Sequence, residues 1–207
     1  MTGWAVAAFA LYVGWAGAAF GVRAVLQHRR TGDAGFRGVP GRPGTAAWWA
    51  GVLFVLALLG GAAAPLGTLA GLPELPGTRA APVQWTGLGI ALAGIAATFA
   101  AQTAMGASWR VGVDAGERTE LVTAGLFAHV RNPVFTAMTV TAAGLGLMTP
   151  NLIAVTALAG VILAVQSQVR AVEEPCLRSV HGAAYATYSS RAGRFLPGIG
   201  RRRIRGV

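Results

Sequence analysis

The fold is decided by residues 128–175, which read AHVRNPVFTAMTVTAAGLGLMTPNLIAVTALAGVILAVQSQVRAVEEP. Two apolar runs within this stretch are separated only by residues 149–151. Two antiparallel helices joined by so short a turn bring their outer ends together. The stretch therefore predicts a helical hairpin in which the polar residues of 129–132 meet the acidic residues of 173–174 at one membrane boundary.

The composition is that of a membrane protein. Of the 207 residues, 54% are hydrophobic and only 12% are charged, about half the charged share of a soluble domain. Runs of about 20 apolar residues can cross a bilayer. The candidate runs are about 4–26, 45–70, 83–105, the shorter 134–148, and 152–169. We expect an all-α integral membrane bundle of about five transmembrane helices, with a C-terminal helical hairpin and a cytoplasmic tail.

The basic residues predict the orientation. All 17 are arginines, and the formal net charge is +10. Nearly all lie on one side of a five-span arrangement, and Arg79 alone lies on the other. Positive residues collect in cytoplasmic loops, so the N-terminus is expected outside and the C-terminus in the cytoplasm. Arginine without lysine hints at a GC-rich genome, which favours the plasma membrane of a bacterium. Arginines between apolar runs favour contact with membrane lipids over nucleic acid.

Small residues recur at helical spacing within the apolar runs. Gly17 and Gly21 form a GxxxG pair, and Ala93, Ala97 and Ala101 repeat at the same interval. Such spacing predicts close helix packing, within the chain or against a second protomer of a homo-oligomer.

Several kinds of site are not expected. The three histidines show no metal-ligand spacing, and neither HExxH nor CxxC occurs, so no metal is predicted. Cys176 is the single cysteine, which excludes an internal disulfide. The glycines of 87–94 lie inside an apolar run rather than between a strand and a helix, which argues against a Rossmann site.

Polar residues that could take part in catalysis or binding lie at the two ends of the hairpin. The first cluster is His129, Arg131 and Asn132, and the second is Arg170, Glu173, Glu174, Tyr185, Tyr188, Arg191 and Arg194. Pro133 suits the first turn of a helix, with Asn132 as its N-cap. Two acids at the end of an apolar helix oppose its macrodipole, so they need arginine or ligand partners.

The order of these motifs resembles the isoprenylcysteine carboxyl methyltransferase family and its phospholipid methyltransferase relatives. The resemblance rests on GLFAHVRNPVF, EEPCL and HGAAYATYSSRAGRFLPGIG, with MGASWR and ELVTAG upstream. It implies S-adenosyl-L-methionine as methyl donor. The implied cofactor-binding residues are Gly125, His129, Val130, Arg131, Asn132, Pro133, Glu173, Glu174, Tyr185 and Tyr188. The implied catalytic residues are Arg170, Glu174 and Arg191.

The resemblance also implies a division of the chain and a reaction. Residues 1–104 would form three N-terminal spans, 105–200 a methyltransferase-like core with the hairpin and cofactor site, and 201–207 a basic tail. The methyl group would pass to a lipophilic acceptor, such as the carboxylate of a prenylcysteine-like molecule or of another lipid-like small molecule. Arg131 is expected to face the donor, because a guanidinium can bind the methionine carboxylate bidentately.

The demand for a base depends on the acceptor. A carboxylate acceptor needs none, whereas an amine or phenol does, with His129 or Glu174 as candidates. Asn132 stands where many family members have histidine, and Phe135 where many have tyrosine; asparagine cannot titrate. Two other functions stay open: a membrane NADPH-dependent sterol-type reductase, whose C-terminal region is similar, and a non-catalytic membrane scaffold.

Overall fold

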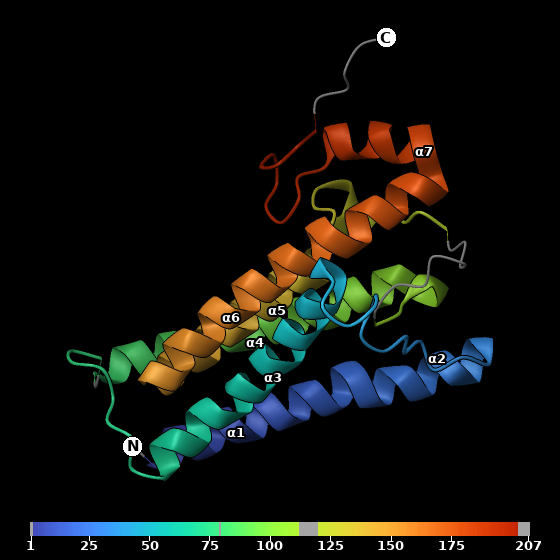
Figure 1. Ribbon diagram of the computed structural model, residues 1–207. Helices are drawn as coiled ribbons and strands as arrows, with labels where there is room; N and C mark the ends of the chain where they lie inside the picture. The colour runs from blue at the N-terminus through green and yellow to red at the C-terminus, as the bar shows by residue number, and fades with distance from the viewer. Residues whose placement is uncertain (1, 79, 112–119, 203–207) are drawn as a thin grey trace.

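The computed structural model describes residues 2–78, 80–111 and 120–202 (Figure 1). Its elements are α1 (Thr2–Ala16), η1 (Gly17–Val22), α2 (Arg23–Thr31), α3 (Ala46–Leu69), α4 (Ala81–Met105), η2 (Gly106–Ser108), η3 (Gly125–Ala128), α5 (Pro133–Met148), α6 (Leu152–Gln168), η4 (Val169–Glu173) and α7 (Glu174–Arg191). Within these ranges there are isolated bridges but no β-strand. The all-α prediction is confirmed.

Four helices of the described chain are long and apolar enough to cross a membrane: Thr2–Thr31, Ala46–Leu69, Ala81–Ser108 and Leu152–Arg191. The remaining apolar helix, α5, has 16 residues. At ~1.5 Å per residue it is about 24 Å long, short of the ~30 Å hydrocarbon core. The predicted membrane bundle is therefore confirmed as four candidate spans and one shorter apolar helix.

The first helix extends further than hydropathy predicts. It continues through a π-helical turn at η1 into α2 and ends only at Gly32, whose φ of 77° and hydrogen bond to the His28 carbonyl oxygen terminate it. The additional helical turns are polar, so a span predicted from its apolar residues ends before them. Arg23 and Gln27 are nevertheless buried, because they donate to the carbonyl oxygens of Gly106 (2.6 Å) and Ala107 (2.7 Å).

Small residues bring α4 and α5 into close contact. A Cβ added to Gly144 would lie 2.3 Å from the Ala91 nitrogen, and one added to Gly94 would lie 2.6 Å from the Thr141 nitrogen. Larger side chains would therefore force these two helices apart. The buried face of α4 carries Ala91, Gly94 and Ala101.

The register predicted for small-residue packing is partly wrong. Ala93 and Ala97 are exposed, and only Ala101 of that series is buried. A Cβ on Gly17 or Gly21 would meet no atom within 4 Å. The GxxxG pair therefore makes no close packing contact within the described chain, and its use in a homo-oligomer stays a prediction.

The hairpin forms as predicted. The Asn151 side chain caps α6 by accepting from the Ala154 nitrogen, and it donates to the Ala64 carbonyl oxygen and the Thr68 hydroxyl on α3. The α5–α6 turn lies at the same end of the bundle as the N-terminus, and α2 and α7 lie at the opposite end (Figure 1). The two polar ends of the hairpin do meet, since Arg131 and Glu174 are joined by a 3.0 Å ion pair.

Candidate functional site

The motif at the start of α5 is held by the chain that follows α7. The backbone nitrogens of Arg131 and Asn132 donate to the carbonyl oxygens of Gly193 and Arg194, and the Gly193 nitrogen donates to the His129 carbonyl oxygen. A Cβ on Gly193 would lie 1.9 Å from a carbonyl oxygen, so only glycine fits there. We call residues 129–132 with 192–194 the clasp.

Glu174 stabilises this clasp by accepting hydrogen bonds from two of its residues, Arg131 and Arg194. Its carboxylate accepts hydrogen bonds from four arginines: Arg131 (3.0 Å), Arg178 (3.2 Å), Arg194 (2.7 Å) and Arg202 (2.8 Å). The residue is 1% exposed, and a buried carboxylate needs such partners. Both oxygens are occupied, so the geometry gives Glu174 a structural role and does not support its use as a catalytic base.

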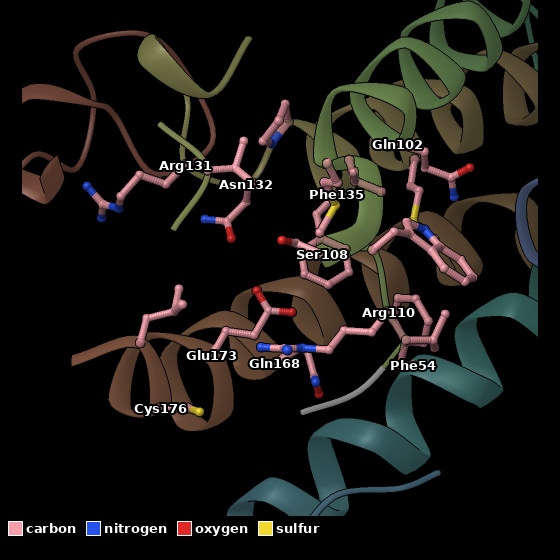
Figure 2. Close-up of a pocket in the computed structure, with 18 of the residues that line it drawn as sticks. Phe54, Gln102, Ser108, Arg110, Arg131, Asn132, Phe135, Gln168, Glu173 and Cys176 are labelled. Atoms are coloured by element: carbon pink, nitrogen blue, oxygen red, sulfur yellow. The ribbon is translucent and has the colours of Figure 1, made fainter. Parts of the chain in front are cut away.

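The Arg131 guanidinium, which we expected to face the donor, is not directed into the cavity. Its guanidinium donates to Glu174 and to the carbonyl oxygens of Ser189, Ala192 and Gly200. Part of the residue lines the cavity described below, but its side chain extends away from that cavity (Figure 2). Both terminal nitrogens of the guanidinium already donate to Glu174 and to these three carbonyl oxygens, and this holds the side chain away from the cavity.

Asn132 is also placed differently from the prediction. It stands immediately before Pro133, the first residue of α5, but its side chain makes no capping bond. Its amide nitrogen donates instead to the Arg194 carbonyl oxygen at 2.9 Å. The Asn132 amide therefore ties the start of α5 to the Arg194 backbone, and it points toward the cavity (Figure 2).

A cavity of about 460 Å³ lies beside the clasp. One end, which we call the polar compartment, is lined by Ser108, Arg110, Asn132, Gln168 and Glu173. In Figure 2, Glu173 and Asn132 point toward the same space from opposite walls, and the Arg110 guanidinium lies beside Glu173.

The other end of the cavity is apolar. This apolar arm is lined by Trp15, Ala19, Phe20, Phe54, Val55, Leu58, Phe135 and Met138. The side chains come from α1, η1, α3 and α5. One continuous space therefore joins charged groups at the bundle end to an apolar interior.

The loop after α2 covers part of the cavity. Gly35 and Arg37 exchange backbone hydrogen bonds with Val111, and Phe36 packs edge-on against Trp109. The loop is braced by an ion pair between Arg37 and Asp33. The hydrogen bond from Arg37 lowers the pKa of Asp33 to about 2.

The chain matches one known family. Residues 83–184, about half of the chain, match the model of the phospholipid methyltransferases. Over this segment the chain belongs to the phospholipid methyltransferase family. No curated protein and no solved structure gives a match. The resemblance predicted from the motifs is confirmed, and membership favours an integral membrane methyltransferase over the reductase and scaffold alternatives.

The family segment contributes to both ends of the cavity. The matched residues include Arg110, Asn132 and Glu173 of the polar compartment and Phe135 and Met138 of the apolar arm, whereas Trp15 and Phe54 precede the matched segment. In this phospholipid methyltransferase-family protein, the N-terminal helices and α5 therefore shape the apolar end of the cavity together.

The residues implied by the resemblance fall into two groups. Those that line the cavity are Arg131, Asn132, Pro133, Glu173, Glu174, Tyr185 and Tyr188. Those that do not are Gly125, His129, Val130, Arg170 and Arg191. Val130 is buried in the clasp, His129 is exposed, and Gly125 begins η3 with φ 60°.

The two arginines predicted to be catalytic lie outside the cavity. Arg170 is exposed and donates to Gln166 (3.0 Å), and Arg191 is exposed in the last turn of α7. A catalytic role for either has no support in this geometry.

Other cavity residues were missed at the sequence level. Arg110 belongs to the MGASWR motif, which was noted only as a family signature, and Gln168 ends an otherwise apolar helix. The signal available in the sequence was a glutamine at the polar end of an apolar run. Nothing local in the sequence distinguishes Trp15 or Phe54 from ordinary lipid-facing residues.

Proposed function

We propose that this protein is an integral membrane S-adenosyl-L-methionine-dependent methyltransferase that acts on a lipophilic acceptor. The observation that carries the proposal is the single cavity that joins the polar compartment to the apolar arm. An amphiphile can place its reacting group among Glu173 and Asn132 and its hydrocarbon part against Phe54 and Met138. The acceptor is a carboxylate of a prenylcysteine-like molecule or of another lipid-like small molecule.

The residues present fit the proposed donor. The polar compartment offers a carboxylate (Glu173), a guanidinium (Arg110) and amides (Asn132, Gln168), which can hydrogen-bond the polar groups of an amino acid and a ribose. Buried aromatic side chains, Phe127 among them, add flat apolar surface to the same cavity. When bound, S-adenosyl-L-methionine supplies an electrophilic methyl group on a sulfonium.

The chain itself contributes orientation and exclusion of water. Aligned reactants in a cavity shielded by Trp109 and Phe36 lose little entropy on reaction, and a carboxylate acceptor then needs no base. For an amine or phenol acceptor, Glu173 is the carboxylate placed to accept the proton. His129 and Glu174, the earlier candidates, lie outside the cavity or are fully hydrogen-bonded.

The proposal includes a location. The arginine-rich end of the bundle, with the polar compartment, would face the cytoplasm by the positive-inside rule, and the N-terminus would lie outside, in the plasma membrane of a bacterium. The acceptor would then enter from the surrounding lipid.

Two experiments test the proposal. The purified protein in detergent is titrated with S-adenosyl-L-methionine by calorimetry, and it is incubated with labelled donor and a bacterial lipid extract, with products identified by mass. We expect donor binding and label in a lipid-soluble product. Absence of donor binding by protein that retains its helical circular dichroism would refute the proposal.

A further inference from the structure

A second cavity, of about 40 Å³, lies among α1, α3, α5 and α6. Small residues face it from three of these helices: Gly61 on α3, Gly146 on α5 and Ala157 on α6. The hydroxyls in its lining, those of Tyr12 and Thr141, already donate to carbonyl oxygens. The space is therefore suited to hydrocarbon.

Three residues of the apolar arm also line this second cavity: Trp15, Leu58 and Met138. Because each of them borders both spaces, together they form the wall that separates the two cavities. We call these three residues the partition.

The two cavities follow one another along the bundle. On α3 the first cavity is lined within 51–58 and the second within 57–64, and on α5 the corresponding ranges are 133–138 and 138–146. The second cavity therefore lies directly beyond the apolar arm, on the side of the α5–α6 turn (Figure 1).

The partition is held firmly by its neighbours. Trp15 and Met138 are 5% and 4% exposed. The Trp15 ring packs against Tyr12 at 5.8 Å and against Phe20 at 6.0 Å between ring centroids. The Tyr12 hydroxyl donates to the Leu58 carbonyl oxygen. A hydrocarbon tail in the apolar arm cannot pass this wall without breaking those contacts.

The position of the partition sets the depth available to a tail. The first cavity follows α3 from Gly51 to Leu58, which at ~1.5 Å per residue is a depth of about 10 Å. The second cavity continues to Ala64 and would add about 9 Å. Since one leaflet of the hydrocarbon core is about 15 Å thick, a tail that ends at the partition is shorter than one leaflet.

We propose that the partition limits the length of the tail that the acceptor can place in the apolar arm, so that the acceptor is an amphiphile with a tail shorter than one leaflet. This inference rests on the proposed function and makes its substrate class more specific. Trp15 and Leu58 precede the matched segment 83–184. The N-terminal helices of this chain therefore contribute two of the three residues that set the limit.

The test is a competition among saturated fatty acids, from octanoic to stearic acid, offered as one equimolar mixture to the protein in detergent. Native mass spectrometry reports which acids are bound. The wild type is compared with Leu58→Ala and Met138→Ala, which open the partition. Leu59→Ala is the matched control, because Leu59 is 62% exposed and lines neither cavity. Every variant meets the same mixture, so uptake of the acids by the detergent cancels.

Forcing additional methylene groups against a packed wall lowers affinity by about 5- to 100-fold. We therefore expect the ratio of bound stearic to bound decanoic acid to rise by about this factor in Leu58→Ala and Met138→Ala, and to keep its wild-type value in Leu59→Ala. Ala142 lines the second cavity, so adding Ala142→Leu to Leu58→Ala should refill that space and restore the wild-type ratio.

Three results would overturn the assignment. They are an unchanged ratio in both opened variants with helical circular dichroism retained, an equal rise of the ratio in Leu59→Ala, and the absence of any bound fatty acid in the wild type. The experiment needs no methyl donor. Length selection by a protein that binds no S-adenosyl-L-methionine would therefore refute the proposed function and leave the limit on tail length in place.

Discussion

Replacement of Glu174 by glutamine tests whether this acid stabilises the fold or binds the ligand. The change removes the negative charge that four arginines share and keeps the size of the side chain. The largest loss of stability comes from the pair with Arg131, because both side chains of that pair are only 2% exposed. Breaking a buried pair from one side costs about 3–5 kcal/mol.

The outer arginines add little to this figure. The side chains of Arg178 and Arg202 are 43% and 39% exposed, and exposed pairs contribute about 0–1 kcal/mol each. The side chain of Arg194 is only 16% exposed, so its pair is counted with that of Arg131 in the figure for a buried pair. We therefore expect Glu174→Gln to cost roughly 4 kcal/mol in all. For a chain of this length, each kcal/mol lowers Tm by about 2–4 °C, so Tm should fall by roughly 10 °C.

The assay is thermal unfolding in detergent, followed by the loss of helical circular dichroism, with S-adenosylhomocysteine affinity measured well below Tm. Arg178→Gln removes one exposed partner of the same carboxylate and should lower Tm by less than about 4 °C. The reasoning is refuted if Glu174→Gln keeps the wild-type Tm and loses ligand affinity, since Glu174 would then contact the ligand directly.

Three further substitutions test packing and the apolar arm. Gly193→Ala should abolish the clasp, because its Cβ would lie 1.9 Å from the Leu196 carbonyl oxygen; little folded protein should be recovered on size exclusion, whereas Gly3→Ala, in open space, should behave as wild type. Gly144→Ala should separate α4 from α5 and lower Tm by about 5 °C or more, with Gly89→Ala as control. Phe54→Trp narrows the apolar arm, so KM should rise for long acceptors, with unchanged affinity for S-adenosylhomocysteine; an unchanged KM would place the acceptor elsewhere.

The sequence was sufficient to predict the helices and to predict that the two polar clusters meet. Both follow from features that are local along the chain: apolar runs of spanning length, and a turn at 149–151 too short to allow anything but a hairpin. The contact between Arg131 and Glu174 is the direct result. The limits of α2 and the packing register of α4 were less predictable, because burial of Arg23 or Ala91 depends on partners distant in sequence.

The roles within the site could not be assigned from the motifs alone. Arg131 and Arg110 are both arginines near the end of an apolar region. Only the return of residues 189–202 toward Arg131 decides that its guanidinium donates to backbone carbonyl oxygens. The apolar arm is a similar case. Trp15 and Phe54 belong to helices whose composition suits any membrane span, and they line a cavity because Phe135 and Met138 face them.

The paired acids show how one motif can serve two purposes. Consecutive residues in a helix point about 100° apart, because one turn takes 3.6 residues, so Glu173 and Glu174 cannot face the same partners. The π-helical turn at Val169–Glu173 ends at the first of the two acids. Such a turn changes the direction in which the following side chains point. Glu174 turns toward the clasp, where four arginines neutralise it, and Glu173 turns toward the cavity beside Arg110. Glu174 is therefore held by the protein itself, and its neighbour Glu173 lines the cavity. Loss of charge at Glu174 should consequently appear first as loss of stability, and loss of charge at Glu173 first as loss of affinity.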